Sequence, residues 1–205
     1  MEKLLNREQA PQWVTEELTR VCGVIEKNME RFGTKFPSAC AENGVYKVTE
    51  NDDWTNGFWT GMLWMAYQYT GEEKFKCLAC ENLKSFEKRL AEHVVLDHHD
   101  IGFLYSLSVG GGYRILGEER LREVLLKAAD ALADRFQEKG GFIQAWRKKG
   151  ARGEYRLIID SLMNLPLLYR ASKLSGDNTY RSMADCHYKN VIENIIRDDY
   201  STYHT

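Results

Sequence analysis

One carboxylate lies between two apolar runs in the stretch Leu157-Ile158-Ile159-Asp160-Ser161-Leu162-Met163-Asn164-Leu165-Pro166-Leu167-Leu168. A second stretch, Asp97-His98-His99-Asp100-Ile101-Gly102-Phe103, also has an Asp directly before an apolar segment. An Asp in this place usually caps a helix N-terminus. Asp160, however, follows Leu-Ile-Ile, so we expect it at a buried floor, where desolvation raises the pKa of a carboxyl group. Pro166 falls in the first two turns of the expected helix and removes a backbone donor, which favours a functional site over two plain caps.

Outward from these stretches, one unit recurs three times after a first helix that runs from Pro11 to Gly33. The unit is a loop with an Asp, an apolar helix, a stop at Gly and an amphipathic helix. Helical hairpins that repeat in this way stack side by side. The expected apolar helices cover residues 54–67, 101–116 and 160–175, and the amphipathic ones cover residues 75–90, 121–136 and 180–196.

The contrast between the two helices of each unit predicts how they are layered. A helix that is apolar all round is buried on most sides, whereas an amphipathic helix faces solvent on one side. We therefore expect an all-α fold with an inner and an outer layer of helices, as in an α/α toroid. The three Asp-bearing loops would then emerge at one end, so that Asp53, Asp100 and Asp160 become neighbours in space.

Two segments outside the helices have separate interpretations. Residues 33–53 show no periodicity and are expected to form a long loop at the rim of a site. Residues 140–146 are expected to form a short strand on the rim, followed by a basic stretch from Arg147 to Arg156. A solvated hairpin is the preferred interpretation of that basic stretch, and a lip for an anionic substrate is the alternative.

Composition narrows the functional classes. The chain has 205 residues, 43% hydrophobic content and a net charge of −2, so no bulk positive field attracts nucleic acid. No apolar run has the length of a membrane span, and no secretory signal opens the chain. The five cysteines are odd in number, and Cys77 and Cys80 lie one helical turn apart with no second pair to partner them, which favours a reducing, cytoplasmic setting. No cofactor or metal is expected.

Several motifs, taken together, resemble unsaturated glucuronyl hydrolases of glycoside hydrolase family 88. They are residues 53–61 (DWTNGFWTG), 98–103 (HHDIGF), 144–146 (QAW), 158–166 (IIDSLMNLP) and 197–205 (RDDYSTYHT). The resemblance runs from about residue 10 to the last residue, in the right order. It implies an (α/α)6 barrel, in agreement with the toroid expected from the repeats.

The resemblance also implies a reaction. The family removes a 4,5-unsaturated uronic acid from oligosaccharides that polysaccharide lyases leave behind, by hydration of the C4=C5 vinyl ether. By motif, Asp160 would be the acid and base, and Asp100 its partner. His99 and His204 would match substrate-binding positions, and Trp54 and Trp146 would match aromatic positions of the sugar pocket. His187, on an apolar stripe, is instead expected to be a core histidine.

The chain departs from the family in length. It has about seven expected helices, whereas a closed barrel of six hairpins has twelve. Residues 1–205 are therefore expected to be the N-terminal part of the barrel domain, weakly active or inactive alone. Self-association or pairing with a complementary half-barrel is expected to cover the open flank.

Alternative functions stay open at the level of sequence. An unsaturated rhamnogalacturonyl hydrolase would use the same chemistry on a pectin-derived disaccharide. An α/α-barrel epimerase would rely on proton transfer by histidine. A non-catalytic half-barrel that binds a sugar or a partner is the third alternative.

Overall fold

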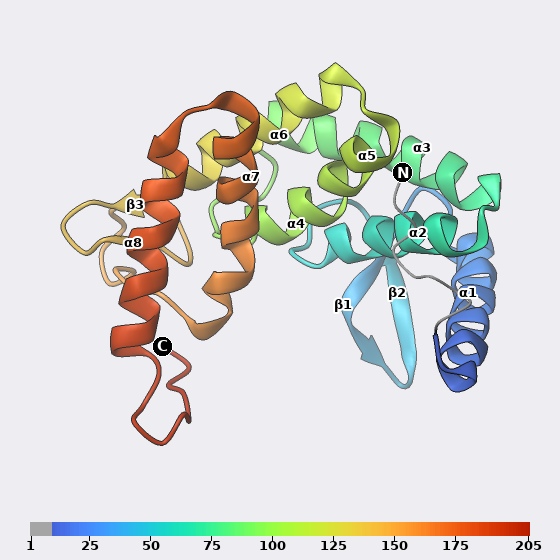
Figure 1. The fold of residues 1–205 in the computed structure, drawn as a ribbon, viewed down its shortest axis with the longest axis horizontal. Helices are drawn as coiled ribbons and strands as arrows, with labels where there is room; N and C mark the ends of the chain where they lie inside the picture. The colour runs from blue at the N-terminus through green and yellow to red at the C-terminus, as the bar shows by residue number, and fades with distance from the viewer. Residues whose placement is uncertain (1–9) are drawn as a thin grey trace.

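Helices dominate residues 10–205, the part of the chain that the computed structural model describes. Helix α1 (Gln12–Phe32) precedes three helical hairpins. The hairpins pair α2 (Asn56–Thr70) with α3 (Glu73–Ala91), the broken helix α4 (Ile101–Leu107) and α5 (Val109–Leu116) with α6 (Glu119–Ala133), and α7 (Leu165–Ser175) with α8 (Asn178–Asn194). They follow one another along an open arc (Figure 1). The predicted all-α class and the three hairpins are confirmed.

The hairpins form the two predicted layers. One row contains α2, α4 and α7, each packed on the next, and the other contains α3, α6 and α8 (Figure 1). Between the rows lies a core of buried apolar side chains. Six of those that are at most 2% exposed are Trp59, Leu63, Leu83, Leu104, Leu125 and Leu168. The arrangement is part of an α/α barrel, and it brings the N-terminal ends of α4 and α7 side by side.

The prediction that each apolar helix ends at a glycine is also confirmed. Gly71, Gly117 and Gly176 follow α2, α5 and α7 with left-handed backbone angles, and each donates its N–H to a carbonyl in the last turn. Glycine adopts this conformation without a steric penalty, which is why these helices end there.

The second apolar helix is not continuous, so the prediction of one helix over residues 101–116 was wrong. It breaks at Ser108, whose hydroxyl donates back to the carbonyl of Leu104, a bond that bends helices. Trp64 Nε1 donates to the Ser108 carbonyl at 2.8 Å. Beyond the break, α5 lies so close to α2 that a Cβ on Gly111 would meet Trp64 at 2.6 Å.

The prediction of a loop over residues 33–53 was wrong as well. Strands β1 (Phe36–Glu42) and β2 (Val45–Thr49) form an antiparallel hairpin there. Asn43 and Gly44 make its turn, with φ of 52° and 75°. Asn-Gly is the residue pair that a two-residue hairpin turn prefers, because both central residues need positive φ.

Two further boundaries differ from the prediction. Phe136 was expected at the end of an amphipathic helix, but it lies in β3 (Phe136–Gln137), which pairs with β4 (Phe142–Ile143) at the expected rim strand. Asp160 lies in a 3-10 helix, η1 (Ile159–Asn164), and not at the start of an α-helix. Pro166 then falls in the first turn of α7, where its missing N–H breaks no helical bond. The interpretation of Pro166 as a disruption was therefore wrong.

Candidate active site

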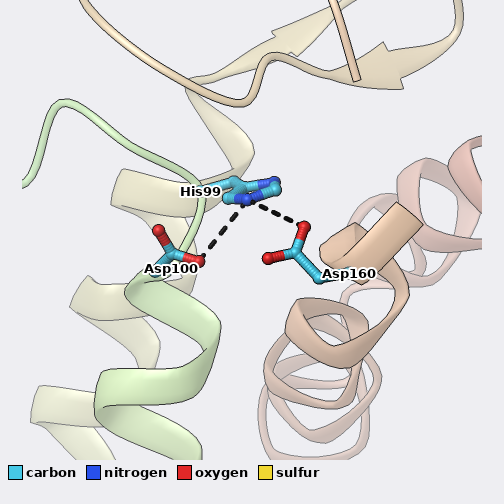
Figure 2. Close-up of side chains that lie close together, drawn as sticks. All are labelled: His99, Asp100 and Asp160. Carbon is cyan, nitrogen blue, oxygen red and sulfur yellow. Dashed lines mark ion pairs between the residues drawn. The ribbon is translucent and has the colours of Figure 1, made fainter. Parts of the chain in front are cut away.

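Three side chains meet between the N-terminal ends of α4 and α7. They come from the segment before α4 and from η1, which precedes α7. His99 and Asp100 directly precede α4, and Asp160 lies in the first turn of η1. His99 Nε2 is 3.4 Å from Asp100 Oδ1 and 3.5 Å from Asp160 Oδ1. Figure 2 shows the imidazole between the two carboxyl groups. The structure thus brings together residues that are 60 positions apart in the sequence, as the repeat predicted.

Burial sets the protonation of this cluster. Desolvation is the main cause that raises the pKa of Asp160, and the charge of Asp100 raises it further. Burial lowers the pKa of His99 to about 4, because the attraction of Asp100 does not offset the loss of solvent. His99 is therefore neutral near pH 7, and the Asp160 carboxyl group holds its proton more tightly than an ordinary Asp does.

Several polar atoms of the cluster lack a hydrogen-bond partner among residues 10–205. Both ring nitrogens of His99 and Oδ1 of Asp160 are buried and make no hydrogen bond. An unpaired buried polar atom costs free energy, so such atoms in a native structure usually await a ligand or water. Oδ1 of Asp160 and the ring nitrogens of His99 therefore have unused hydrogen-bonding capacity at the centre of the cluster.

Neither carboxylate acts as a helix cap. Asp100 is the N-cap residue of α4, but its side chain makes no capping bond, and none is made at the start of η1. The amide of Phe103 is instead bonded to Oδ1 of Asn164 at 2.9 Å. The plainer interpretation of both Asp residues as caps is therefore wrong.

Asp53, the third Asp of the repeat, has a different environment. Its carboxylate accepts from the Thr55 amide at 3.3 Å, and its backbone carbonyl accepts from the buried guanidinium of Arg89 at 2.8 Å. The group of candidate ligand atoms that lies within 4.8 Å contains His99, Asp100 and Asp160 without Asp53. Asp53 thus stabilises the turn before α2, and the prediction that it joins Asp100 and Asp160 was wrong.

Trp54 lies in an aromatic group at the entrance to α2. Its ring is 45% exposed and packs edge-on against Phe103 and Phe58, with centroids 6.0 Å and 6.4 Å apart. Phe103 is in the first turn of α4, three residues after Asp100. An exposed indole in this place can stack on a pyranose ring, and this role of Trp54 stays a prediction.

Trp146 is joined by backbone pairing to the segment that carries His98 and His99. The backbone of Trp146 bridges to His98, and the amide of His99 donates to the Ala145 carbonyl at 2.8 Å. The buried side chain of Gln144 donates to the Trp146 carbonyl at 2.7 Å, so it fixes the loop that carries the indole. The guanidinium of Arg156 stacks 5.8 Å from the Trp146 ring.

His204 lies next to Asp160 through its backbone. Its carbonyl accepts from the Ile159 amide at 3.0 Å, and its charge opposes the rise in the pKa of Asp160. The terminal segment is therefore hydrogen-bonded to the start of η1. The exposed imidazole is within electrostatic reach of the acid, and its contact with substrate stays a prediction.

His187 is a core histidine, as expected, but its position has a consequence for the site. Nδ1 accepts from the Ile143 amide at 2.9 Å, which leaves Nε2 as the donor to Ser161 Oγ at 2.8 Å. It thereby links β4 to the residue after Asp160. Burial lowers the pKa of His187 to about 4. The apolar stripe of α8 indicated a buried ring, but gave no sign of this link.

The cluster can also be considered as a metal site. Its nitrogen and carboxylate oxygens lie within 4.8 Å of one another, which a divalent cation could bridge. The same groups form an acid–base set without a cation, because one carboxyl group has a raised pKa and a second carboxylate lies beside it. A carboxyl group with a raised pKa and a second carboxyl group beside it, in part of an α/α barrel, form a site that is suited to acid–base chemistry.

The comparisons assign the family. The sequence profile described as Glycosyl Hydrolase Family 88 matches residues 27–204, and the chain belongs to this family. It is 45% identical over 192 residues to the unsaturated chondroitin disaccharide hydrolase of Streptococcus agalactiae serotype III (strain NEM316), covering 94% of this chain and 48% of that protein. It is 42% identical over 184 residues to the unsaturated glucuronyl hydrolase of Bacillus sp. (strain GL1), covering 89% and 49%.

Comparison with solved structures leads to the same family. The crystal structure of the unsaturated glucuronyl hydrolase from Streptococcus agalactiae superposes with a TM-score of 0.91 at 44% identity, over 95% of this chain and 49% of the other. A variant of that enzyme complexed with dGlcA-GalNAc6S superposes with a TM-score of 0.79 at 36% identity, over 100% and 51%. The chain thus spans about half the length of the relatives it matches.

Proposed function

We propose that this chain supplies the acid–base part of an unsaturated glucuronyl hydrolase, which releases 4,5-unsaturated uronic acid from lyase-generated glycosaminoglycan oligosaccharides. The contact of Asp160 and Asp100 with the buried ring of His99 is the observation that carries the proposal. Support for the substrate class comes from relatives that are named for chondroitin disaccharides and from one that was crystallised with dGlcA-GalNAc6S.

In the proposed reaction, Asp160 is first the acid and then the base. Its carboxyl group transfers a proton to C4 of the vinyl ether, and positive charge develops at C5 and the ring oxygen. The resulting carboxylate takes a proton from water as the water oxygen bonds to C5, so Asp160 regains its proton. The hemiketal then collapses and releases the second sugar. One water molecule is consumed and no covalent sugar–enzyme bond forms.

The environment of Asp160 suits this role. A general acid at neutral pH needs a pKa above the ordinary range of a carboxyl group, and both burial and the charge of Asp100 act in that direction. Asp100 would hold this charge and orient His99. Neutral His99 would hydrogen-bond the uronate, Trp54 and Trp146 would flank the sugar, and His204 would contact substrate from the terminal segment.

An unsaturated rhamnogalacturonyl hydrolase remains the alternative enzyme, since it would need the same acid. Product analysis on chondroitin, hyaluronan and pectin disaccharides separates the two. An epimerase would produce an epimer without loss of the conjugated uronate absorbance. A half-barrel without activity would show neither.

The proposed partner and setting follow from the same features. We propose that the open flank of the third hairpin is covered by self-association or by a complementary half-barrel, because apolar side chains are exposed on α7 and α8: Tyr169, Tyr188 and Ile192. Cys40, Cys77, Cys80 and Cys186 are free thiols, which supports a reducing cytoplasm. Within residues 10–205, no helix has the length and apolarity needed to span a membrane.

A chimera tests the function directly. Residues 1–205 would replace the matching half of the Streptococcus agalactiae hydrolase, and turnover of an unsaturated chondroitin disaccharide would be compared with that of the same chimera carrying Asp160→Asn. Activity that depends on Asp160 supports the proposal. A folded chimera that does not hydrolyse the disaccharide, or whose Asp160→Asn form remains active, contradicts it.

A further inference from the structure

We propose that Asn164 is a positioning residue, which caps α4 from a distance and thereby leaves the carboxylate of Asp100 free for the acid–base cluster. The inference deepens the proposed function, because Asp100 matters for turnover only if that function is right. The capping itself can be tested without turnover.

The start of α4 creates the need for a cap. The first four amides of a helix have no partner within the helix, and an Asp at the N-cap normally accepts from the second or third of them. Asp100 occupies the N-cap, and Phe103 is the third residue of the helix. The Phe103 amide is buried, so leaving it unpaired would destabilise the start of α4. Asp100 is therefore the expected acceptor for this amide, unless another side chain takes its place.

Asn164, and not Asp100, accepts the hydrogen bond from the Phe103 amide. Its side chain is 1% exposed, and its Oδ1 accepts from the Phe103 amide at 2.9 Å across a separation of 61 residues. Asp100 has φ −67° and ψ 4°, away from the extended angles from which an N-cap side chain usually turns back onto the helix. Its two carboxylate oxygens lie near the rings of His98 and His99 instead.

Gly102 makes the long-range cap possible. A Cβ at this position would lie 2.3 Å from the Cα of Asn164, so any side chain would push η1 away from α4. The backbones of the two segments therefore touch at Gly102 and Asn164, while the ring of His99 lies between the carboxyl groups of Asp100 and Asp160. Asn164 is four residues after Asp160, and Gly102 is two residues after Asp100, so this contact also sets the separation of the two carboxyl groups.

The charged and titratable groups around Asp160 make the consequence measurable. Asp160 faces Asp100 and His99 from the α4 side and His204 from the terminal segment. Without Asn164, the Phe103 amide would recruit the carboxylate of Asp100, which is the nearest acceptor along the chain. Asp100 would then turn away from the cluster, and its repulsion of the Asp160 carboxylate would weaken.

The test compares Asn164→Ala with Asn82→Ala, which truncates another fully buried Asn, at the contact of α3 with α2. Carbon-13 NMR titration of the Asp160 carboxyl group in each purified chain gives its pKa. We expect Asn164→Ala to lower this pKa by about half a unit or more, since a neighbouring like charge is withdrawn, and Asn82→Ala to leave it unchanged. An unchanged pKa in folded Asn164→Ala, or an equal shift in both variants, overturns the proposal.

A second measurement serves if Asn164→Ala does not fold. Hydrogen exchange of the Phe103 amide is followed in the wild-type chain and in Asp100→Ala. We expect equal protection in both, because Asn164 is the acceptor. Loss of protection in Asp100→Ala would show that Asp100 is the cap and would refute the proposal. Neither readout depends on hydrolysis, so inactivity of the chain would count against the proposed function alone.

Discussion

Two buried histidines should make the chain lose stability in mild acid. His99 and His187 each have a pKa of about 4 in the folded chain, against 6.5 as the ordinary value. Between these values the unfolded chain binds a proton at each ring and the folded chain does not. Because stability rises with pH wherever the unfolded state binds more protons, it falls as pH is lowered from 7 towards 4.

The size of the effect follows from the two pKa values. Each ring lowers the free energy of unfolding by about 2 kcal/mol between pH 7 and pH 5. The raised pKa of Asp160 acts with the opposite sign, because the folded chain then binds the extra proton. His187→Gln removes one of the two imidazoles and leaves the contributions of His99 and Asp160 in place.

Urea unfolding at pH 8, 7, 6 and 5 measures this contribution. We expect the wild-type free energy of unfolding to fall more steeply than that of His187→Gln below pH 7, with a difference of about 2 kcal/mol in the loss between pH 7 and pH 5. Between pH 8 and 7 the two curves should run parallel, which controls for any constant cost of the substitution. Parallel curves down to pH 5 would refute the view that His187 is buried in its neutral form.

Three further predictions concern the site and its surroundings. In an active form of the protein, Asp100→Asn should reduce turnover. It should also move the alkaline limb of the pH profile to lower pH, because Asp100 helps to raise the pKa of Asp160. An unchanged pH profile would count against this coupling. Dialysis against a chelator should leave turnover unchanged, because the carboxyl groups act directly as acid and base; activity that is lost and then regained with a divalent cation would indicate a metal bound by His99 and both Asp residues. Sedimentation of the 205-residue chain should reveal self-association through the apolar side chains exposed on α7 and α8, whereas a clean monomer would disagree.

The sequence predicted those features that depend on local periodicity. The apolar and amphipathic helices, their glycine stops and the approach of Asp100 to Asp160 all follow from one repeated unit. The β1–β2 hairpin was missed, although Asn43-Gly44 with an alternating strand after it was a usable signal.

Other features depend on contacts that no local pattern encodes. The break at Ser108 involves Trp64, and the cap on Phe103 comes from Asn164, 61 residues away. The motif that contains Asn164 was noticed, but its local sequence does not indicate a long-range acceptor. Likewise, the stripe on α8 predicted burial of His187 but not its bond to Ser161.

The role of Asp160 is tested most directly by Asp160→Asn in the chimera with the Streptococcus agalactiae hydrolase. Asn preserves the size of the side chain, and the substitution should leave the fold intact, but Asn cannot transfer a proton to C4. We expect the absorbance of the unsaturated uronate to fall with the wild-type chimera and to stay constant with the variant at equal protein concentration. A variant that is folded and retains more than a small residue of activity would contradict the assignment of Asp160 as the acid and base.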